Sequence, residues 1–166
     1  MKFSDLLIAS TSLNHDEICF WEPKTLAPYE PLTEKKFSAA PNTLQVSSAN
    51  HVLCASAQKT TMNVWRWDKK EPVLRFPVKE MLSVVRFSTN GGSMCIAGSK
   101  TGRLSVWQVT SGELIGEIES AHYVEVTDLD ISVTNDLVVT GGKDFKVKVW
   151  VLTDLFFGGS GNKNPN

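Results

Sequence analysis

The sequence predicts an all-β protein, an incomplete β-propeller of about three and a half four-stranded antiparallel blades. Tryptophans recur at intervals of 44, 42 and 43 residues, and each closes a short run in which apolar and polar residues alternate. Alternation with a period of two indicates a half-buried strand, and a repeat of about 40 to 45 residues is typical of propeller blades. The blade-closing residues are Trp21, Trp65, Trp107 and Trp150.

The last repeat, residues 121–150, has the most complete pattern. Two β-branched runs, 126–131 and 137–140, flank a turn of Thr, Asn and Asp. A Gly-Gly turn then leads to a third strand at 146–150, where valines alternate with lysines up to the tryptophan. We therefore expect one antiparallel sheet with polar residues where its strands end.

The earlier repeats contain strand-like runs at similar places, and the third has an Asn-Gly hairpin signal. The expected strands are 5–11 and 17–21 with a weak outer strand within 23–31, then 43–47, 51–56, 61–67 and 72–76, then 83–87, 93–98, 103–109 and 113–118.

Four side chains of the last repeat are suited to a hydrogen-bonded network. A buried indole N–H needs an acceptor, and the hydroxyl of Thr140, ten residues before Trp150, can accept it and donate its own proton to His122. Asp144 lies in the tight turn and would orient the imidazole. We interpret this network as structural, tying the inner strand to the third one.

A hydrolase is the catalytic alternative, with Thr140 as nucleophile and His122 with Asp144 as its base. The sequence disfavours it because a threonine on a strand followed by Gly-Gly is not a nucleophile elbow. No oxyanion or metal device lies nearby in the sequence. We therefore expect no enzymatic activity and no catalytic residue.

The repeats are degenerate at the polar positions. In the place of Asp144 they carry Thr101, Lys59 and His15, and in the place of Thr140 they carry Ala97, Ala55 and Thr11. Only the last repeat is expected to form the full network, and the others to rely on packing alone.

Composition is that of an ordinary globular protein. The 166 residues include 42% hydrophobic residues and carry a net charge of −1, so no global field attracts nucleic acid or an anionic membrane. Direct nucleic-acid contact stays open. No apolar run reaches the roughly 18 residues of a membrane-spanning helix. We expect one domain at 1–155, the partial propeller, and a flexible Gly/Asn-rich tail at 156–166.

Cys19, Cys54 and Cys95 are far apart and have no metal-ligand spacing with histidines. Reduced thiols in strand-like runs are expected, which suits a cytoplasmic or nuclear compartment. No metal and no cofactor is predicted.

The last repeat is similar to a known family. Ala-His-Tyr-Val-Glu-Val-Thr at 121–127 and Thr-Gly-Gly-Lys-Asp-Phe-Lys-Val-Lys-Val-Trp at 140–150 resemble WD repeats, and among them the WD-repeat subunit of the rixosome. The resemblance extends over roughly residues 5–155. It implies a WD40-type propeller in which His122, Thr140, Asp144 and Trp150 are structural.

The resemblance also implies a function. Members of that family are non-enzymatic scaffolds of a complex in the nucleus, nucleolus and nucleoplasm that processes rRNA and matures the pre-60S particle. The implied partners are a helical-repeat scaffold subunit, a further helical subunit and the AAA ATPase midasin. In some fungi the complex also serves heterochromatin. Whether the complete protein forms a homodimer stays open.

A generic WD-repeat adaptor is the alternative function, for example a ubiquitin-ligase or signalling subunit that binds peptides on the top face of the propeller. Partner contacts are expected at the loop residues Tyr123, Lys143 and Phe145. Trp67 either packs on the neighbouring blade or joins an exposed binding patch. Because family members have a complete propeller, we expect part of a longer protein or a half-propeller that another chain completes.

Overall fold

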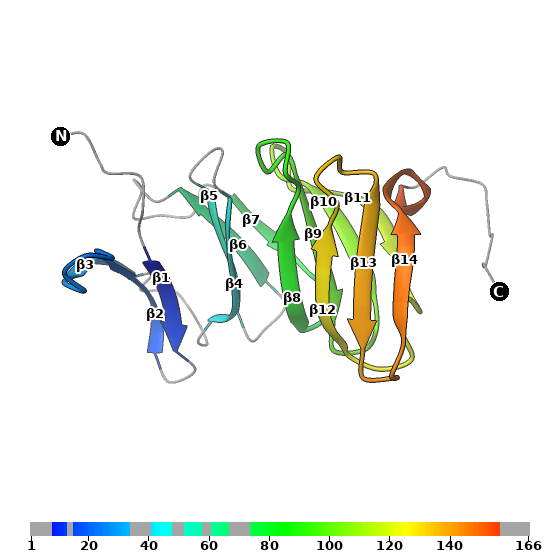
Figure 1. Ribbon diagram of the computed structural model, residues 1–166, viewed down its shortest axis with the longest axis horizontal. Coiled ribbons are helices and arrows are strands. Elements are labelled where there is room, and N and C mark those ends of the chain that lie inside the picture. The colour runs from blue at the N-terminus through cyan, green and yellow to red at the C-terminus, as the bar shows by residue number, and fades with distance from the viewer. Residues whose placement is uncertain are drawn as a thin grey trace.

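The chain forms four antiparallel sheets that stand one after another (Figure 1). The computed structural model describes residues 8–12, 15–33, 41–47, 52–57, 61–66 and 74–156. Sheet 1 contains β1 (Ile8–Ser12), β2 (His15–Trp21) and β3 (Pro28–Thr33), and sheet 2 contains β4 (Pro41–Ser47), β5 (Val52–Ala57), β6 (Thr61–Arg66) and β7 (Leu74–Pro77). Sheet 3 contains β8 (Leu82–Phe87), β9 (Met94–Ser99), β10 (Leu104–Gln108) and β11 (Glu113–Ile118), and sheet 4 contains β12 (Val126–Ile131), β13 (Leu137–Gly142) and β14 (Val147–Val151).

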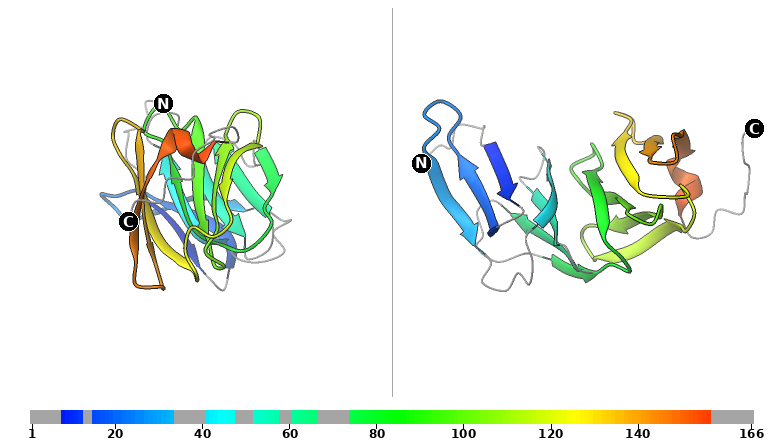
Figure 2. Two further views of the ribbon diagram at one scale, coloured as in Figure 1. Left: turned by 90° about the vertical axis from the view of Figure 1, so that its right-hand side faces the viewer. Right: turned by 90° about the horizontal axis from the view of Figure 1, so that it is seen from below.

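The sheets are arranged as propeller blades. The first strands of sheets 2, 3 and 4, which are β4, β8 and β12, lie next to one another, and β1 contacts β4. Seen from below, the sheets follow an open arc (Figure 2). The prediction of an all-β, incomplete propeller with short antiparallel strands is therefore confirmed.

The strand register shows which part of a blade each outer sheet represents. Trp150 pairs with Val138 on β13, and Trp21 pairs in the same way with Ile8 on β1. Strand β1 therefore corresponds to the second strand of sheet 4. Among the described residues, sheet 1 has the last three strands of a blade and sheet 4 the first three.

Sheet 3 is buried on both faces because it lies between sheets 2 and 4. Consecutive residues of a strand point to opposite sides, so each strand of sheet 3 contributes to both cores. On β9, Cys95 belongs to a core shared with sheet 2, and Ile96 belongs to a core shared with sheet 4; neither is exposed. The first core also contains Met62, and the second Val126. Alternation in the sequence thus places one apolar layer on each side of this sheet.

The end of the chain differs in detail from the expected boundary between the domain at 1–155 and the tail at 156–166. A short 3₁₀ helix, η1 (Leu152–Leu155), follows β14 directly and buries both of its leucines. Phe156, expected as the first tail residue, forms an antiparallel bridge with Gly116. Residues 157–166 lie outside the described residues. No helix in the described part of the chain is long and apolar enough to cross a membrane.

Candidate functional site

Sheet 4 brings together the four side chains expected to form a network. The Nε1–H of Trp150 donates to Thr140 Oγ1 at 2.9 Å, and the same oxygen lies 2.8 Å from His122 Nε2. The Nδ1 atom of His122 lies 2.8 Å from Asp144 Oδ1. His122 and Thr140 are each only 1% exposed. The network therefore joins the segment before β12 to β13, to the turn after it and to β14.

The hydrogen-bond partners of Thr140 and His122 determine where the protons of the network lie. An indole N–H only donates, so Thr140 accepts from Trp150 and its own proton is available for His122 Nε2. The ring proton of a neutral His122 then lies on Nδ1 and is donated to the carboxylate of Asp144. Every polar atom of the imidazole is satisfied without a net charge on the ring.

Asp144 is held as a carboxylate. Desolvation by burial acts to raise its pKa, but hydrogen bonds from His122 and from the backbone N–H groups of Tyr123 and Lys146 outweigh this and lower the pKa to about 2. The buried hydroxyl of Thr140 lies between two partners and does not face solvent. The arrangement is suited to fastening strands rather than to presenting a nucleophile.

Sheet 1 corrects the expectation that the other repeats rely on packing alone. Trp21 Nε1–H donates to Ser10 Oγ at 2.9 Å. The acceptor is Ser10 rather than Thr11, because the β1–β2 register shifts between Thr11 and Ser12 and the hairpin holds one more residue than in sheet 4. Ser10 pairs with Cys19 as Thr140 pairs with Lys148. A count of ten residues back from the tryptophan therefore missed this hydroxyl.

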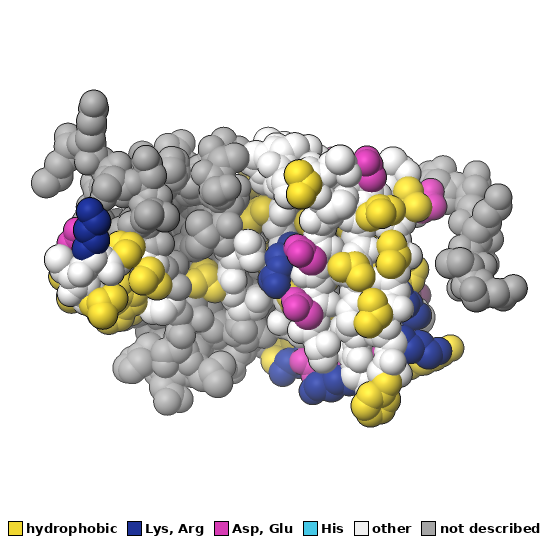
Figure 3. Space-filling view, viewed as in Figure 1, with side chains coloured by type: hydrophobic (Ala, Val, Ile, Leu, Met, Phe, Trp, Pro, Cys, Tyr) yellow, Lys and Arg dark blue, Asp and Glu magenta, His cyan; other side chains and the backbone are white. Residues whose placement is uncertain are grey.

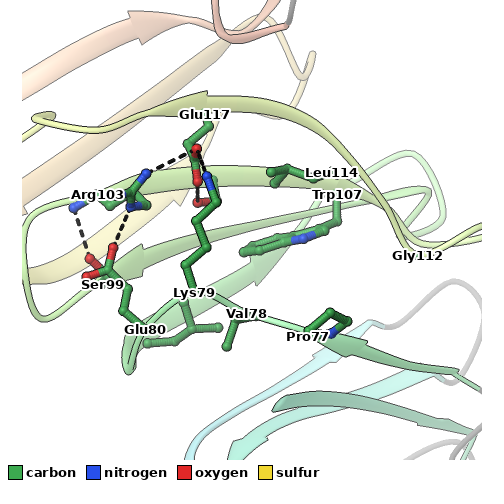
Figure 4. A pocket seen from close by; sticks show the side chains of 12 residues that line it. Pro77, Val78, Lys79, Glu80, Ser99, Arg103, Trp107, Gly112, Leu114 and Glu117 are labelled. Carbon is green, nitrogen blue, oxygen red and sulfur yellow. Dashed lines mark hydrogen bonds and ion pairs between the residues drawn. The ribbon is translucent and has the colours of Figure 1, made fainter. Parts of the chain in front are cut away.

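Sheet 3 replaces the histidine network with ion pairs (Figure 4). Arg103 Nε lies 2.5 Å from Glu80 Oε1, and Arg103 Nη1 lies 3.1 Å from Glu117 Oε2 and 3.3 Å from Glu119 Oε1. Lys79 Nζ lies 2.6 Å from Glu117 Oε2. Thr101, in the place of Asp144, hydrogen-bonds to Glu80. The signal in the sequence is the charged pair Lys79 and Glu80 just before β8. The comparison of repeats did not include these two positions.

These ion pairs border a pocket of about 410 Å³ between β7 and sheet 3. Its apolar wall includes Val78, Trp107 and Leu114. Desolvation acts to raise the pKa of Glu117, but Lys79 and Arg103 lower it overall. Desolvation acts to lower the pKa of Arg103, and its carboxylate partners raise it overall. The charges are thus paired with one another rather than directed at an open site.

Three of the expected partner-contact residues lie on loops of sheet 4. Tyr123 is 77% exposed, and the Nζ atom of Lys146 lies 5.1 Å from the centre of its ring. Phe145 is fully exposed in a left-handed conformation with φ of 61°. Lys143 Nζ lies 2.6 Å from Glu125 Oε2. Trp67, the fourth, lies outside the described residues.

Some expected residues are placed only in part. Trp107 is 4% exposed, and Trp65 is the last residue but one of β6, although its side chain lies outside the description. Cys19 and Cys95 are not in disulfide bonds. In the part of the chain that the structure describes, no three His, Cys, Asp or Glu side chains are grouped to hold a metal.

Comparison with protein families identifies the repeat. Residues 112–151 match the family described as WD domain, G-beta repeat. Residues 112–151 therefore form a WD repeat. The matched WD repeat begins at β11, the outer strand of sheet 3, and continues through the three strands of sheet 4.

Several curated relatives are similar to this chain. Pre-rRNA-processing protein IPI3 of Mycosarcoma maydis is 28% identical over 70% of the chain and 19% of the relative, and that of Yarrowia lipolytica is 33% identical over 65% and 25%. Protein ROOT INITIATION DEFECTIVE 3 of Arabidopsis thaliana is 28% identical over 90% of the chain and 34% of the relative. The chain therefore spans about a fifth to a third of the length of these relatives.

Proposed function

We propose that this WD-repeat chain belongs to a non-enzymatic scaffold that acts in pre-rRNA processing and in maturation of the large ribosomal subunit. The observation that carries the proposal is its similarity to pre-rRNA-processing proteins of several fungi, over about two thirds of the chain. Because the chain spans only part of those relatives, the function of the whole protein is inferred from them.

The chemistry of the site supports a scaffold. The histidine that would serve a hydrolase is 1% exposed, and both of its ring nitrogens are occupied within the sheet. A general base must reach the proton that it abstracts from a substrate. Function then depends on the surface rather than on this network.

The surface that we assign to partner binding is the sheet 4 loop cluster, defined as Tyr123, Lys143 and Phe145. Two exposed aromatic rings suit an interface centre, where aromatic residues contribute much of the binding energy, and Lys143, which pairs with Glu125, suits the polar rim. Trp67 is a further candidate from the sequence alone.

The partners that we propose are a helical-repeat scaffold subunit, a further subunit of the same complex, the midasin ATPase and the pre-60S particle. The proposed location is the nucleus, including nucleolus and nucleoplasm, and a chromatin role and a homodimer belong to the same proposal. The resemblance of residues 121–127 and 140–150 to the rixosome subunit supports these assignments.

Affinity purification from nuclear extract followed by mass spectrometry tests the proposal. Large-subunit ribosomal proteins with midasin and a helical-repeat scaffold are the expected result. Recovery of cullins or signalling proteins without pre-ribosomal proteins would overturn it in favour of a generic adaptor.

A matched pair of variants tests the loop cluster. Tyr123→Ser with Phe145→Asn removes both rings, and asparagine tolerates the left-handed backbone at 145. We expect this variant to lose the partners while it stays folded. Val133→Ala, at an 85% exposed turn position away from the cluster, is expected to retain them. Equal recovery by both variants would exclude the cluster as the contact surface.

A further inference from the structure

Two loops at one end of sheet 4 are joined into a single platform. The segment before β12 carries Tyr123, and the turn between β13 and β14 carries Phe145. Tyr123 N–H donates to Asp144 Oδ2 at 3.2 Å, and Lys143 N–H donates to Glu125 O at 2.9 Å. Because these bonds run directly from one loop to the other, the exposed side chains of both loops keep a fixed relation to one another.

The histidine network anchors this platform from inside the sheet. His122 Nδ1 lies 2.8 Å from Asp144 Oδ1, and a Cβ atom at Gly142 would lie 2.3 Å from the same nitrogen. On the other side, His122 N–H donates to Gly102 O in the turn of sheet 3 at 2.9 Å. The buried network therefore holds the surface loops in place, and such preorganisation lowers the entropic cost of binding a ligand.

Two lysines of the platform have unused positive charge. The Nζ atom of Lys146 lies 5.1 Å from the centre of the Tyr123 ring, and that of Lys148 lies 5.9 Å from it. In the described part of the chain, neither ammonium group lies within ion-pair distance of a carboxylate. Lys143, by contrast, pairs with Glu125 at 2.6 Å. Two positive charges beside one exposed ring are thus available to an anion from outside the chain.

Phe145 adds an apolar group at the tip of the turn. Its ring is fully exposed and adds nothing to the core, and its φ of 61° is unfavourable for a bulky residue. Strained positions of this kind cluster at ligand-binding sites. Figure 3 shows lysine and arginine side chains beside hydrophobic ones at the end of the molecule where β14 begins. The surface therefore combines positive charge with apolar area.

We propose that the lysine–tyrosine site, defined as Tyr123, Lys146 and Lys148, binds an extended acidic segment of a partner protein that carries carboxylates on alternate residues. The inference rests on the proposed function, because it specifies the chemistry of the partner at the adjoining sheet 4 loop cluster. The two lysines are themselves alternate residues at the start of β14, and alternate residues of an extended chain lie about 7 Å apart. Two carboxylates separated by one residue match that spacing, and an apolar residue beside them would contact Phe145.

The site is better suited to a polypeptide than to nucleic acid. Single-stranded nucleic acid stacks its bases on exposed aromatic faces, but the ammonium groups of Lys146 and Lys148 already lie over the ring of Tyr123. A phosphate backbone also needs a longer run of cations, whereas Lys143 is paired with Glu125 and the chain has a net charge of −1. Two carboxylates need only the two available lysines.

A dye-labelled peptide, Ser-Glu-Ser-Glu-Leu-Ser, is the probe, and its fluorescence anisotropy is measured as the 166-residue chain is added. In about 50 mM salt, which screens surface charges only weakly, we expect a Kd of about 0.1 mM. One control peptide has glutamine in place of both glutamates and is expected to bind about tenfold more weakly. The other, Ser-Glu-Glu-Ser-Leu-Ser, keeps the charge but directs the carboxylates to opposite sides, and weaker binding is again expected. Equal binding of the probe and either control would overturn the proposal.

Matched charge variants locate the site on the protein. Lys146→Gln with Lys148→Gln is expected to weaken probe binding by about tenfold, and the glutamine at 148 can still donate to Ala121 O as the lysine does. Lys24→Gln with Lys100→Gln changes the net charge equally at exposed positions outside the platform, and is expected to leave binding unchanged. Equal effects of the two pairs would contradict a defined site.

A single variant covers the case in which the double variant does not fold. The ammonium group of Lys146 makes no hydrogen bond in the described part of the chain, so Lys146→Gln is expected to fold normally. We expect it to weaken probe binding by about threefold. Unchanged binding in this folded variant would overturn the proposal.

Single-stranded RNA is the competing ligand. A ten-residue oligouridine that displaced the probe and bound more tightly, with the same dependence on Lys146 and Lys148, would make this a nucleic-acid site and the proposal wrong. RNA that leaves the probe bound supports an acidic polypeptide.

The outcome is separable from that of the proposed function. Recovery of pre-ribosomal proteins from nuclear extract without binding of the acidic probe would reject this ligand and leave the role in ribosome maturation intact. Probe binding that depends on the two lysines, without recovery of pre-ribosomal proteins, would do the reverse.

Discussion

His122 stabilises the fold through both of its ring nitrogens. Replacing it with alanine leaves Thr140 and Asp144 without their shared partner and opens a cavity at a site that is 1% exposed. We expect His122→Ala to lower the free energy of unfolding by about 2–4 kcal/mol in a denaturant titration. The neighbouring Tyr123→Ala is expected to change it by less than about 0.5 kcal/mol. Unchanged stability of His122→Ala would contradict a structural role.

Asp144 makes stability depend on pH in the acid range. Its pKa is about 2 in the folded chain and 3.8 for the unperturbed side chain, so the unfolded chain binds the proton first as the pH falls. The stabilising contribution is therefore complete above about pH 4 and is lost between about pH 4 and pH 2. Thermal melts of the parent and Asp144→Asn are expected to differ at pH 7 and to converge toward pH 2. Glu117 is present in both proteins, so its titration does not change the difference between their melting temperatures. If that difference stayed constant from pH 7 to pH 2, Asp144 would be excluded as the cause of the pH dependence.

Single polar residues were predictable only where the hairpin has the expected length. Counting ten residues back from Trp150 leads to Thr140, which does accept the indole N–H. The same count from Trp21 leads to Thr11, but the acceptor is Ser10 because the register of β1 and β2 is irregular. An extra residue in a turn changes the spacing between the tryptophan and its acceptor, and a fixed count along the sequence cannot detect it. The ion pairs of Arg103 were also not predicted, because the repeats were compared only at the histidine, threonine and aspartate positions.

At the scale of elements, alternation and turn residues locate most of the strands to within a few residues. The helix η1 was missed because one turn of helix has no periodicity to detect. Its leucines are buried in the core between sheets 3 and 4, through tertiary contacts that do not show in the local sequence. The outer strand expected within 23–31 is observed as β3, at Pro28–Thr33.

Gly116 controls the fit between η1 and β11. A Cβ atom at this position would lie 1.9 Å from the carbonyl oxygen of Leu155, which is backbone and has little freedom to move. We expect Gly116→Ala to displace η1 and to cost about 1–3 kcal/mol of stability, measured by thermal or chemical denaturation. Gly141→Ala is the control, since its Cβ would approach only Thr127 Oγ1, at 3.7 Å. Equal stabilities of the two variants would show that η1 does not pack closely on β11.

In the whole molecule, sheet 3 is held by cores on both of its faces. Ile96 on β9 and Val139 on β13 occupy the same register position in their sheets, yet they are 0% and 38% exposed. We expect Ile96→Ala to cost about 2–5 kcal/mol and Val139→Ala less than about 1 kcal/mol in the 166-residue chain. Similar losses in both variants would mean that the face of sheet 4 is covered in solution.

The WD repeat matched at 112–151 is out of phase with the sheets, because it starts with the last strand of one sheet and supplies the first three strands of the next. Duplication of such a unit in a gene completes one blade while it begins another, so a ring can gain a blade without an unpaired strand in between. The same offset matters for protein dissection. A cut at Gly112, where the matched repeat begins, separates β11 from β10, whereas a cut near Ser120 leaves every strand of sheet 3 on one side.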